Sequence, residues 1–417
     1  MDKQVIILAA GASSRFHPFA KKTHKTMHYV CGKPLIGWTL EGLEKIGVKD
    51  IVVVVASDDT EIKQYIKENH SKTKLAYQDE PLGMGDALLA AEDMLADSFA
   101  VGFGHMVDPQ VFESLWEKGD AGAKLLVDET DEPWKYGILK FDGKKAVGIV
   151  EKPDKGKEPS NTRSAGVYLL TKEYIEILKN TPQSHYNFEV ALDELMKKSG
   201  VGVVEAREPV ASLKYSWDLF VIRDYLLDNL PERKAKSAKI APTATVEGKV
   251  ILEEGARIFD YALIQGPVYI GKNAVVGAYS IVRDHSTLEE GAEVQRYADC
   301  TRSMFGRNSH IHSGFVGDSI LGDSIRIGAG FITANRRVDR KDVEVVVKGE
   351  KVPSQSSYLG ALMGDEVKVG INASTMPGVV IGKGAKIGPG TCVMENVDED
   401  NLVYSDHRKA TVAKKLE

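Results

Sequence analysis

The segment Leu8–Arg15 combines residue types that suit the binding of an anion. It starts in a run of strand formers, Val5–Leu8, and continues through Gly11, two hydroxyl side chains and an arginine before Pro18. Small side chains let backbone N–H groups approach an anion closely. The guanidinium of Arg15 offers several donors to phosphate oxygens. An ordinary turn with a surface arginine has the same composition. The segment is therefore either an anion-binding turn or an ordinary one.

The elements around this segment predict where it lies. Apolar runs at residues 51–55, 75–77 and 99–103 alternate with helical patterns at 35–46, 61–68 and 85–95. This alternation predicts a Rossmann-like α/β fold, with a parallel sheet covered by helices on both faces. In such sheets ligands bind at the carboxyl ends of the strands. We therefore expect one edge of the sheet to hold a nucleotide between Leu8–Arg15, Gln78, Gly83–Gly85 and Gly104–Asp108.

The second half has a different periodicity. After a charged linker at residues 231–239, every sixth residue is aliphatic. Neither a helix nor a strand explains a period of six, whereas the hexapeptide parallel β-helix does. The pattern predicts an all-β domain over residues 240–398, with an excursion at about 335–363 and a tail at 399–417. The aliphatic positions are Ile240, Val246, Leu252, Ile258, Ile264, Ile270, Val276, Val282, Leu288 and Val294, then Leu321, Ile327, Val369, Ile381, Ile387 and Val393.

Composition excludes several classes of protein. The 417 residues carry a net charge of −6, so no global basic field predicts binding to nucleic acid or to an anionic membrane. No apolar run approaches the roughly 20 residues that span a bilayer, and no signal-peptide pattern is present. The three cysteines are far apart and have no metal-site spacing. We expect a cytoplasmic protein.

The two halves together resemble the sugar-1-phosphate nucleotidylyltransferases that carry a C-terminal left-handed β-helix. The resemblance covers almost the whole chain and is strongest to the archaeal-type branch, which combines UDP-N-acetylglucosamine pyrophosphorylase with glucosamine-1-phosphate acetyltransferase activity. It implies a nucleotidyltransferase domain over residues 1–230. The motifs that carry it are Leu8-Ala-Ala-Gly-Ala-Ser-Ser-Arg15, Gly32-Lys-Pro-Leu35, Ile149-Val-Glu-Lys-Pro153, Trp217-Asp218-Leu219, Phe315-Val-Gly-Asp-Ser319 and Gly328-Ala-Gly-Phe-Ile-Thr-Ala-Asn335.

The resemblance also implies a reaction and a role for each matched residue. A sugar-1-phosphate oxygen attacks the α-phosphorus of a nucleoside triphosphate and expels pyrophosphate, so the protein must align two anions and neutralise charge. Taken singly, Lys25 and Lys152 could equally be solvated surface lysines. The implied contacts are Leu8, Ala9, Ala10 and Gly11 with base and ribose, Gln78 and Gly83 with the base, Arg15 and Lys25 with the triphosphate, Tyr136, Gly137 and Glu151 with the sugar, and Lys152 with the sugar phosphate.

The implied metal site departs from the family pattern. Relatives hold Mg²⁺ with an aspartate directly after Gly104 and a second one, here Asp218, but this chain has His105 instead. Mg²⁺ prefers oxygen ligands. His105 could accept another metal such as Mn²⁺, bind phosphate as a cation, mark a lost activity, or be structural. Asp108 would lie about 10 Å further along an extended segment, so it could replace the aspartate only if the chain turns sharply.

Two smaller departures lie in the nucleotide loops. His24 and Thr26 flank Lys25 where relatives have prolines, and Met84 stands where they have a threonine. Gln78 favours a pyrimidine base, although Met84 removes a hydroxyl near it. The resemblance implies a UDP-N-acetylhexosamine enzyme. It leaves open a mannose-1-phosphate guanylyltransferase or a glucose-1-phosphate nucleotidylyltransferase with a structural β-helix, and a regulatory protein that only binds sugar nucleotides.

The β-helix could carry a second activity. In acetyltransferase relatives a histidine acts as general base on a sugar amine that attacks acetyl-CoA, and His312 occupies that place. Asn335 is the implied contact to the acceptor sugar. Phe315 replaces a tyrosine and Arg302 only loosely matches an expected basic residue, so His312 could instead be a polar corner residue. Lysines of the excursion could meet phosphates, and the family predicts a homotrimer assembled through the β-helix.

Overall fold

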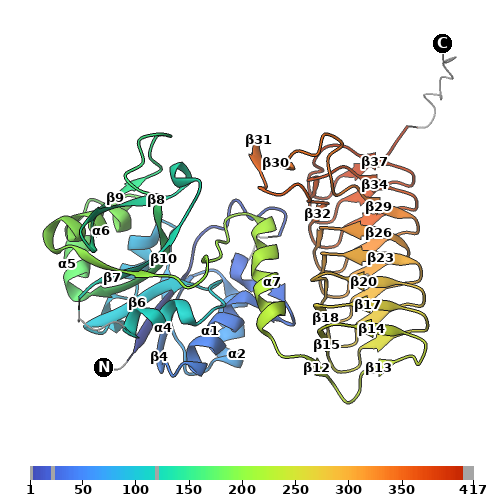
Figure 1. Cartoon of the computed structure of the whole chain (residues 1–417), viewed down its shortest axis with the longest axis horizontal. Coiled ribbons are helices and arrows are strands. Elements are labelled where there is room, and N and C mark those ends of the chain that lie inside the picture. Colours follow the sequence, from blue (N-terminus) through green and yellow to red (C-terminus); the bar gives the residue numbers. More distant parts are fainter. Residues whose placement is uncertain (1–2, 20–23, 118–121, 407–417) are drawn as a thin grey trace, which may run out of the picture. The chain divides into compact units, whose positions relative to one another are not determined.

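The protein is described by a computed structural model that covers residues 3–19, 24–117 and 122–406 (Figure 1). The described chain forms two compact units. The first comprises residues 3–13, 24–28 and 33–213, and the second comprises residues 14–19, 29–32 and 214–406. The short segments 14–19 and 29–32 therefore belong to the second unit although they lie near the N-terminus of the chain.

The first unit is built on one nine-stranded sheet with the order β5-β4-β1-β6-β10-β7-β11-β9-β8. The strands β5, β4, β1 and β6 are parallel to one another, as predicted. Their bounds and those of the rest are β1 Gln4–Ala9, β4 Asp50–Ala56, β5 Lys74–Gln78, β6 Ser98–Phe103, β7 Lys124–Glu129, β8 Gly137–Asp142, β9 Lys145–Glu151, β10 Thr162–Thr171 and β11 Val201–Glu205.

The other half of the sheet is mixed, which corrects the prediction of a parallel sheet. Strand β10 is antiparallel to both β6 and β7, and β8 and β9 form an antiparallel hairpin. The reason is local: only Gly143 and Lys144 separate β8 from β9, and such a short connection can only join antiparallel strands. No helix lies between β9 and β10 to return the chain to the same edge.

Helices cover both faces of this sheet, because alternate residues of each strand point to opposite faces. On β1, Ile6 and Leu8 belong to one apolar cluster, which includes side chains of α3, α5 and α6. Val5 and Ile7 belong to the other cluster, which includes side chains of α1, α2 and α4. The helices are α1 Leu35–Lys45, α2 Thr60–Asn69, α3 Met84–Leu89, α4 Gln110–Glu117, α5 Lys172–Asn180 and α6 Asn187–Ser199.

The second unit is a β-helix of three parallel sheets, as the six-residue period predicts (Figure 1). The first sheet contains β12 Arg233–Lys234, β15 Val250–Leu252, β18 Val268–Ile270, β21 Thr287–Leu288, β24 Met304–Phe305, β27 Ile320–Leu321, β32 Leu362–Met363 and β35 Val380–Ile381. The second contains β13 Lys239–Ile240, β16 Arg257–Ile258, β19 Val275–Val276, β22 Glu293–Val294, β25 His310–Ile311, β28 Arg326–Ile327, β33 Lys368–Val369, β36 Lys386–Ile387 and β38 Leu402–Val403. The third contains β14 Thr245–Glu247, β17 Leu263–Gln265, β20 Ile281–Arg283, β23 Ala298–Thr301, β26 Gly314–Gly317, β29 Phe331–Thr333, β34 Ser374–Thr375 and β37 Cys392–Val393.

The predicted aliphatic positions form its core except at the first coil, where Ile240 is half-buried. Leu252 through Val294 are buried at every sixth position, whereas Val246 is exposed. The core also continues where the period stops, through Phe305, Ile311 and Val316. The period breaks there because the coils shorten: Ile258 lies 18 residues after its partner Ile240, but Phe305 lies 17 residues after Leu288.

The ends of the β-helix differ from the predicted bounds. Strand β12 lies inside the expected linker and pairs with β15, and β38 lies inside the expected tail and pairs with β36. The excursion contains an antiparallel hairpin, β30 Glu344–Val347 and β31 Glu350–Pro353. Helix α7, Leu219–Asn229, also belongs to the second unit. No helix in the described parts of the chain is both long and apolar enough to span a membrane.

Candidate functional site

The loop after β1 is shaped for close approach of a ligand. Leu8, Ala9 and Ala10 are buried at the carboxyl end of the strand, and Gly11 is exposed beyond them. The hydroxyl of Ser13 accepts the backbone N–H of Lys25 at 3.1 Å. This bond connects the loop to the short 3-10 helix η1, Lys25–Met27. The predicted base-contacting loop and the predicted phosphate-binding lysine therefore lie side by side, and together they are called the nucleotide cradle.

His24 supports this cradle in a neutral form. Its backbone N–H donates to Asp59 Oδ2 at 2.9 Å, and its Nδ1 lies 2.8 Å from Thr26 Oγ1 at the start of η1. Burial, and then the charge of Lys25, lowers the pKa of His24 from 6.5 to about 3. The Lys25 ammonium itself donates to the carbonyl of Leu213. A neutral His24 adds no second positive charge beside the lysine.

His105 is also buried and neutral. Burial lowers its pKa well below the ordinary value, and the charge of Lys25 lowers it further. The ring stacks on Phe103 with centroids 5.7 Å apart and hydrogen-bonds the backbone of Ala211, while Nδ1 has no partner in the described residues. These surroundings oppose an imidazolium, so they do not favour the interpretation of His105 as a phosphate-binding cation.

Gln78 and Gly83 lie next to each other, as predicted, but their contacts are with the protein. The Gln78 amide donates to Gly83 O at 3.2 Å and to Asp86 Oδ2 at 2.8 Å. Gly83 has a φ of +125°, and a Cβ there would lie 2.6 Å from the carbonyl oxygen of His185. Gln78 thus holds the start of α3 in place, and glycine is needed at position 83 for both its conformation and its close packing.

The four residues that the resemblance assigns to the sugar come together at the end of the β8–β9 hairpin. Gly137 pairs with Glu151, and Lys152 N donates to Tyr136 O at 3.0 Å. A Cβ on Gly137 would lie 2.8 Å from Glu151 Oε2, so glycine gives this carboxylate its room. Lys152 Nζ lies 3.7 Å from Glu151 Oε1. The result is an exposed corner with one carboxylate and one ammonium.

This corner lies at the same edge of the sheet as the loop after β1. Arg163 on β10 pairs both with Ile138 of β8 and with Asp128 near the carboxyl end of β7. Strands β6 and β7 run in the same direction, because β10 is antiparallel to each of them. The carboxyl edge predicted to bind the nucleotide therefore also carries the sugar corner.

The remaining predicted residues of the nucleotide site lie elsewhere. Arg15 and Asp218 belong to the second unit, so the first unit does not contain them. Asp218 Oδ2 accepts the backbone N–H groups of Lys214 and Tyr215 at 2.6 and 2.8 Å. The chain does turn after Gly104, but Asp108 accepts the N–H of Gln110 at 3.0 Å and so begins α4. Asp108 Oδ1 is therefore engaged at the start of α4.

The residues present do not fit a resident Mg²⁺ ion at His105. The ring offers a nitrogen against an aromatic ring rather than an oxygen, and Mg²⁺ prefers hard oxygen ligands. Within the described residues, no three histidine, cysteine, aspartate or glutamate side chains gather into a possible metal site.

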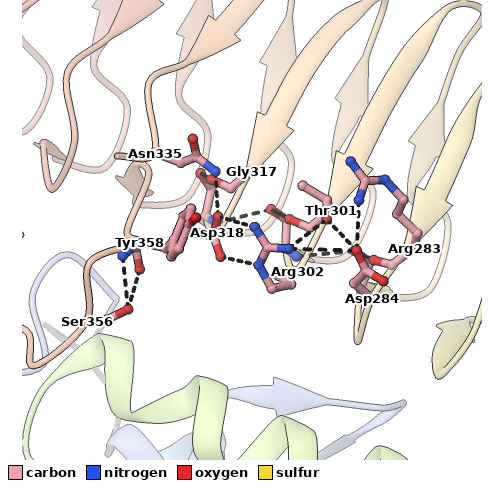
Figure 2. Close-up of polar contacts among 12 residues, drawn as sticks. Arg283, Asp284, Thr301, Arg302, Gly317, Asp318, Asn335, Ser356 and Tyr358 are labelled. Atoms are coloured by element: carbon pink, nitrogen blue, oxygen red, sulfur yellow. Dashed lines mark hydrogen bonds and ion pairs between the residues drawn. The ribbon is translucent and has the colours of Figure 1, made fainter. Parts of the chain in front are cut away.

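In the β-helix, the predicted acceptor contact Asn335 belongs to a network of charges at one corner (Figure 2). Its amide donates to Asp318 Oδ2 at 2.6 Å, and Arg302 binds the same carboxylate through Nε and Nη2 at 2.6 and 3.0 Å. Arg302 also lies 3.7 Å from Asp284 Oδ2. Asp284, Arg302 and Asp318 all have positive φ and stack in successive coils, so their charges alternate along this corner.

His312 lies at a different corner from Asn335. It is exposed between β25 and β26, on the second and third sheets, whereas Asn335 follows β29 where the third sheet leads to the first. The full width of the third sheet separates the two corners. Phe315 lies on β26 between them and is half-buried. One copy of the chain therefore does not bring the candidate base and the candidate acceptor contact together.

Sequence reasoning missed two residues that the structure places at the centre of the first unit's site. Asp128 and Arg163 form a largely buried ion pair, with Arg163 Nε 2.6 Å from Asp128 Oδ1. They lie 35 residues apart on antiparallel strands, so no local motif indicates their pairing.

The fold defines a class: an α/β domain joined to a β-helix with hexapeptide repeats. Residues 4–218 match the nucleotidyl transferase family, and residues 360–394 match the bacterial transferase hexapeptide family. The chain is 32% identical to the bifunctional protein GlmU of Methanococcus maripaludis over 404 residues, 96% of each chain. It therefore belongs to the nucleotidyl transferase family, in the group that carries hexapeptide repeats.

Two further proteins are similar to this chain. The bifunctional sugar-1-phosphate nucleotidylyltransferase/acetyltransferase of Sulfurisphaera tokodaii is 31% identical over 405 residues, 94% of this chain and 98% of that one. The solved structure of UDP-glucose pyrophosphorylase from Acinetobacter baumanii is 22% identical, with a TM-score of 0.48 over 55% of this chain and 95% of that one.

Proposed function

We propose that the first unit transfers a nucleotidyl group from a nucleoside triphosphate to a sugar-1-phosphate, with UTP and an N-acetylhexosamine-1-phosphate as substrates. The observation that carries the proposal is that the residues expected to contact the two substrates lie on one edge of one sheet. The loop Leu8–Gly11 would contact base and ribose, and Lys25 the triphosphate. The corner of Tyr136, Gly137 and Glu151 would contact the sugar, and Lys152 the sugar phosphate.

The chemistry asks the protein for alignment and charge neutralisation. The sugar-phosphate oxygen forms a bond to the α-phosphorus, and the bond from that phosphorus to the bridging oxygen breaks, releasing pyrophosphate. Lys152 and Lys25 would reduce the repulsion between the two anions. Glu151 would accept hydrogen bonds from sugar hydroxyls. A divalent cation would enter with the nucleotide, as part of that substrate.

A panel of substrates tests the proposal. The full chain is mixed with each nucleoside triphosphate and several sugar-1-phosphates, in Mg²⁺ and separately in Mn²⁺, and pyrophosphate is measured. We expect release that depends on both substrates and is fastest with UTP. Release with GTP and mannose-1-phosphate alone would assign the guanylyltransferase alternative. No release from any pair would reject nucleotidyl transfer.

A second candidate function rests on His105. A neutral, stacked imidazole where relatives have an aspartate favours a protein that binds sugar nucleotides without transfer. The variant His105→Asp separates the two functions. If the protein is a sensor, this variant should gain turnover that the wild type lacks. If it is a working transferase, the variant should keep or lose activity.

We further propose that the β-helix acetylates an amino-sugar phosphate with acetyl-CoA, at sites formed between copies of the chain in a homotrimer. The support is the separation of His312 from Asn335 on different corners, since a second copy could bring the two corners together. Lys341, Lys348 and Lys351 of the excursion would meet phosphates. A thiol-release assay with glucosamine-1-phosphate, compared with His312→Ala, tests the site. Unchanged activity in His312→Ala would reject this acetyltransferase site. A monomer mass in solution would reject both the homotrimer and the acetyltransferase.

A further inference from the structure

The segment Val210–Leu213 contacts two groups near the loop after β1, the half-buried Lys25 and the buried His105. It has no regular secondary structure and follows β11. The carbonyl of Leu213 accepts a hydrogen bond from the Lys25 ammonium, and the backbone of Ala211 hydrogen-bonds His105. A lysine side chain has four rotatable bonds and would otherwise sample many positions. The place of this segment therefore decides where the Lys25 ammonium points.

The segment is fixed in turn by the ion pair of Asp128 and Arg163. The backbone N–H of Val210 donates to Asp128 Oδ2 at 3.0 Å, and Val210 O accepts from Arg163 Nη2 at 3.3 Å. Arg163 binds Asp128 with two donors, at 2.6 and 2.7 Å. The exposed fraction is 13% for the arginine side chain and 6% for the aspartate. A charge-assisted pair with so little exposure holds its geometry firmly.

The same guanidinium also contacts the sugar corner. Its centre lies 4.5 Å from the centroid of the Tyr136 ring, so the guanidinium and the ring form a cation–π contact. The aspartate and the tyrosine together raise the pKa of Arg163, against the effect of its burial. One planar group thus orders a segment on the phosphate side of the site and an aromatic ring on its sugar side.

We propose that Asp128 and Arg163 are a positioning pair that aligns the two substrate sites of the first unit with each other. The pair touches neither substrate and acts through Val210–Leu213 and through Tyr136. The inference rests on the proposed function in taking Lys25 and Tyr136 as substrate contacts. Lysine cannot replace Arg163, because an ammonium lacks the planar fork that binds a carboxylate with two donors while a ring stacks on its face.

The test compares Arg163→Lys with Tyr136→Leu in the full chain. Arg163→Lys should raise the KM for the sugar-1-phosphate and the KM for the nucleotide, each about tenfold, and lower kcat, because misplaced groups lose alignment. Tyr136→Leu should raise only the KM for the sugar-1-phosphate. Glu92→Gln, which breaks an exposed ion pair with Lys179, is the control and should change neither KM. Both KM values within twofold of the wild type in Arg163→Lys would overturn the proposal.

A second variant keeps the test decisive if Arg163→Lys does not fold. Asp128→Leu combined with Arg163→Met removes both charges, so no buried charge is left unpaired. The same two KM values should rise in it, and unchanged values in the folded double variant would overturn the proposal.

A readout without turnover separates this inference from the proposed function. The side-chain ¹⁵N signals of His105 report the hydrogen bond between its ring and the backbone of Ala211. In Arg163→Lys these signals should shift at constant pH, because the segment that carries Ala211 is released. If the wild type releases no pyrophosphate, the proposed function fails, and the pair is then judged by this signal. Unchanged His105 ¹⁵N signals in Arg163→Lys would overturn the positioning role independently.

Discussion

His24 makes the stability of the first unit depend on pH, and the variant His24→Asn isolates that dependence. The folded protein keeps His24 neutral, with a pKa of about 3 against 6.5 in the unfolded chain. His24 precedes η1 and accepts from Thr26 N, a capping place where asparagine is among the preferred residues. The substitution therefore keeps the cap and removes the titrating ring.

The sign and size of the effect follow from linkage. A base with a depressed folded pKa contributes stability above its unfolded pKa, and that stability is lost as the pH falls from 6.5 towards 3. At pH 5 the unfolded chain has taken up the proton and the folded chain has not, which destabilises the wild type by about 2 kcal/mol relative to pH 7.5. The asparagine variant lacks this term. Any free energy lost through poorer packing around the ring is the same at both pH values, so it cancels in the change between them.

Urea unfolding at pH 7.5 and pH 5.0, followed by tryptophan fluorescence, measures the difference. Three of the four tryptophans, Trp38, Trp116 and Trp134, lie in the first unit and Trp217 lies in the second, so most of the signal comes from the first unit. The free energy of unfolding of the wild type should fall by about 2 kcal/mol more than that of His24→Asn between the two pH values. Equal losses in the two proteins, within about 0.5 kcal/mol, would refute the assignment of a buried neutral His24.

Three further predictions address other groups. Burial raises the pKa of Glu289 from 4.5 to about 7, although two backbone N–H groups donate to its carboxylate. The protonated side chain stabilises the fold below pH 4.5, and this stabilisation is lost as the pH rises to 7. The free energy of unfolding of the wild type should therefore fall by about 3 kcal/mol more than that of Glu289→Gln over that window, and equal losses in the two proteins would contradict this. His105→Asp should make thermal stability respond to Mg²⁺, whereas equal responses of variant and wild type would show that the site's geometry cannot bind it. Gly137→Ala places a Cβ 2.8 Å from Glu151 Oε2 and should raise the KM for the sugar-1-phosphate several-fold, while Gly122→Ala, with no atom within 4 Å of the new Cβ, serves as control; equal KM values would remove Glu151 from the sugar site.

The architecture could be predicted where one periodicity dominates. The run Val5–Leu8 became the buried strand β1, and the period of six located the β-helix. The period failed at Phe305 because the coils there are shorter. Phe305 still points into the core of the β-helix, but it no longer follows its partner Leu288 by 18 residues. The mixed half of the sheet was missed because the direction of β10 depends on which strands it pairs with, and its own residues do not specify that.

The candidate site could be predicted where its residues belong to one local motif, and not where they come from distant strands. Gly137 and Glu151 face each other because they end one hairpin, and the family motifs contain both. The Asp128–Arg163 pair depends on the register between β7 and β10, which a single sequence does not reveal. The neutral state of His105 depends on its burial beside Lys25. No residue type encodes such an environment.

The central claim is that the first unit joins a nucleotide to a sugar phosphate, and ³¹P NMR of the full chain with UTP, N-acetylglucosamine-1-phosphate and a divalent cation tests it most directly. The account predicts equal amounts of pyrophosphate and a nucleoside diphosphate sugar, formed only when both substrates are present, and a large loss of rate in Lys152→Met. Orthophosphate formed without the sugar phosphate, or bound substrates that remain unchanged, would contradict it.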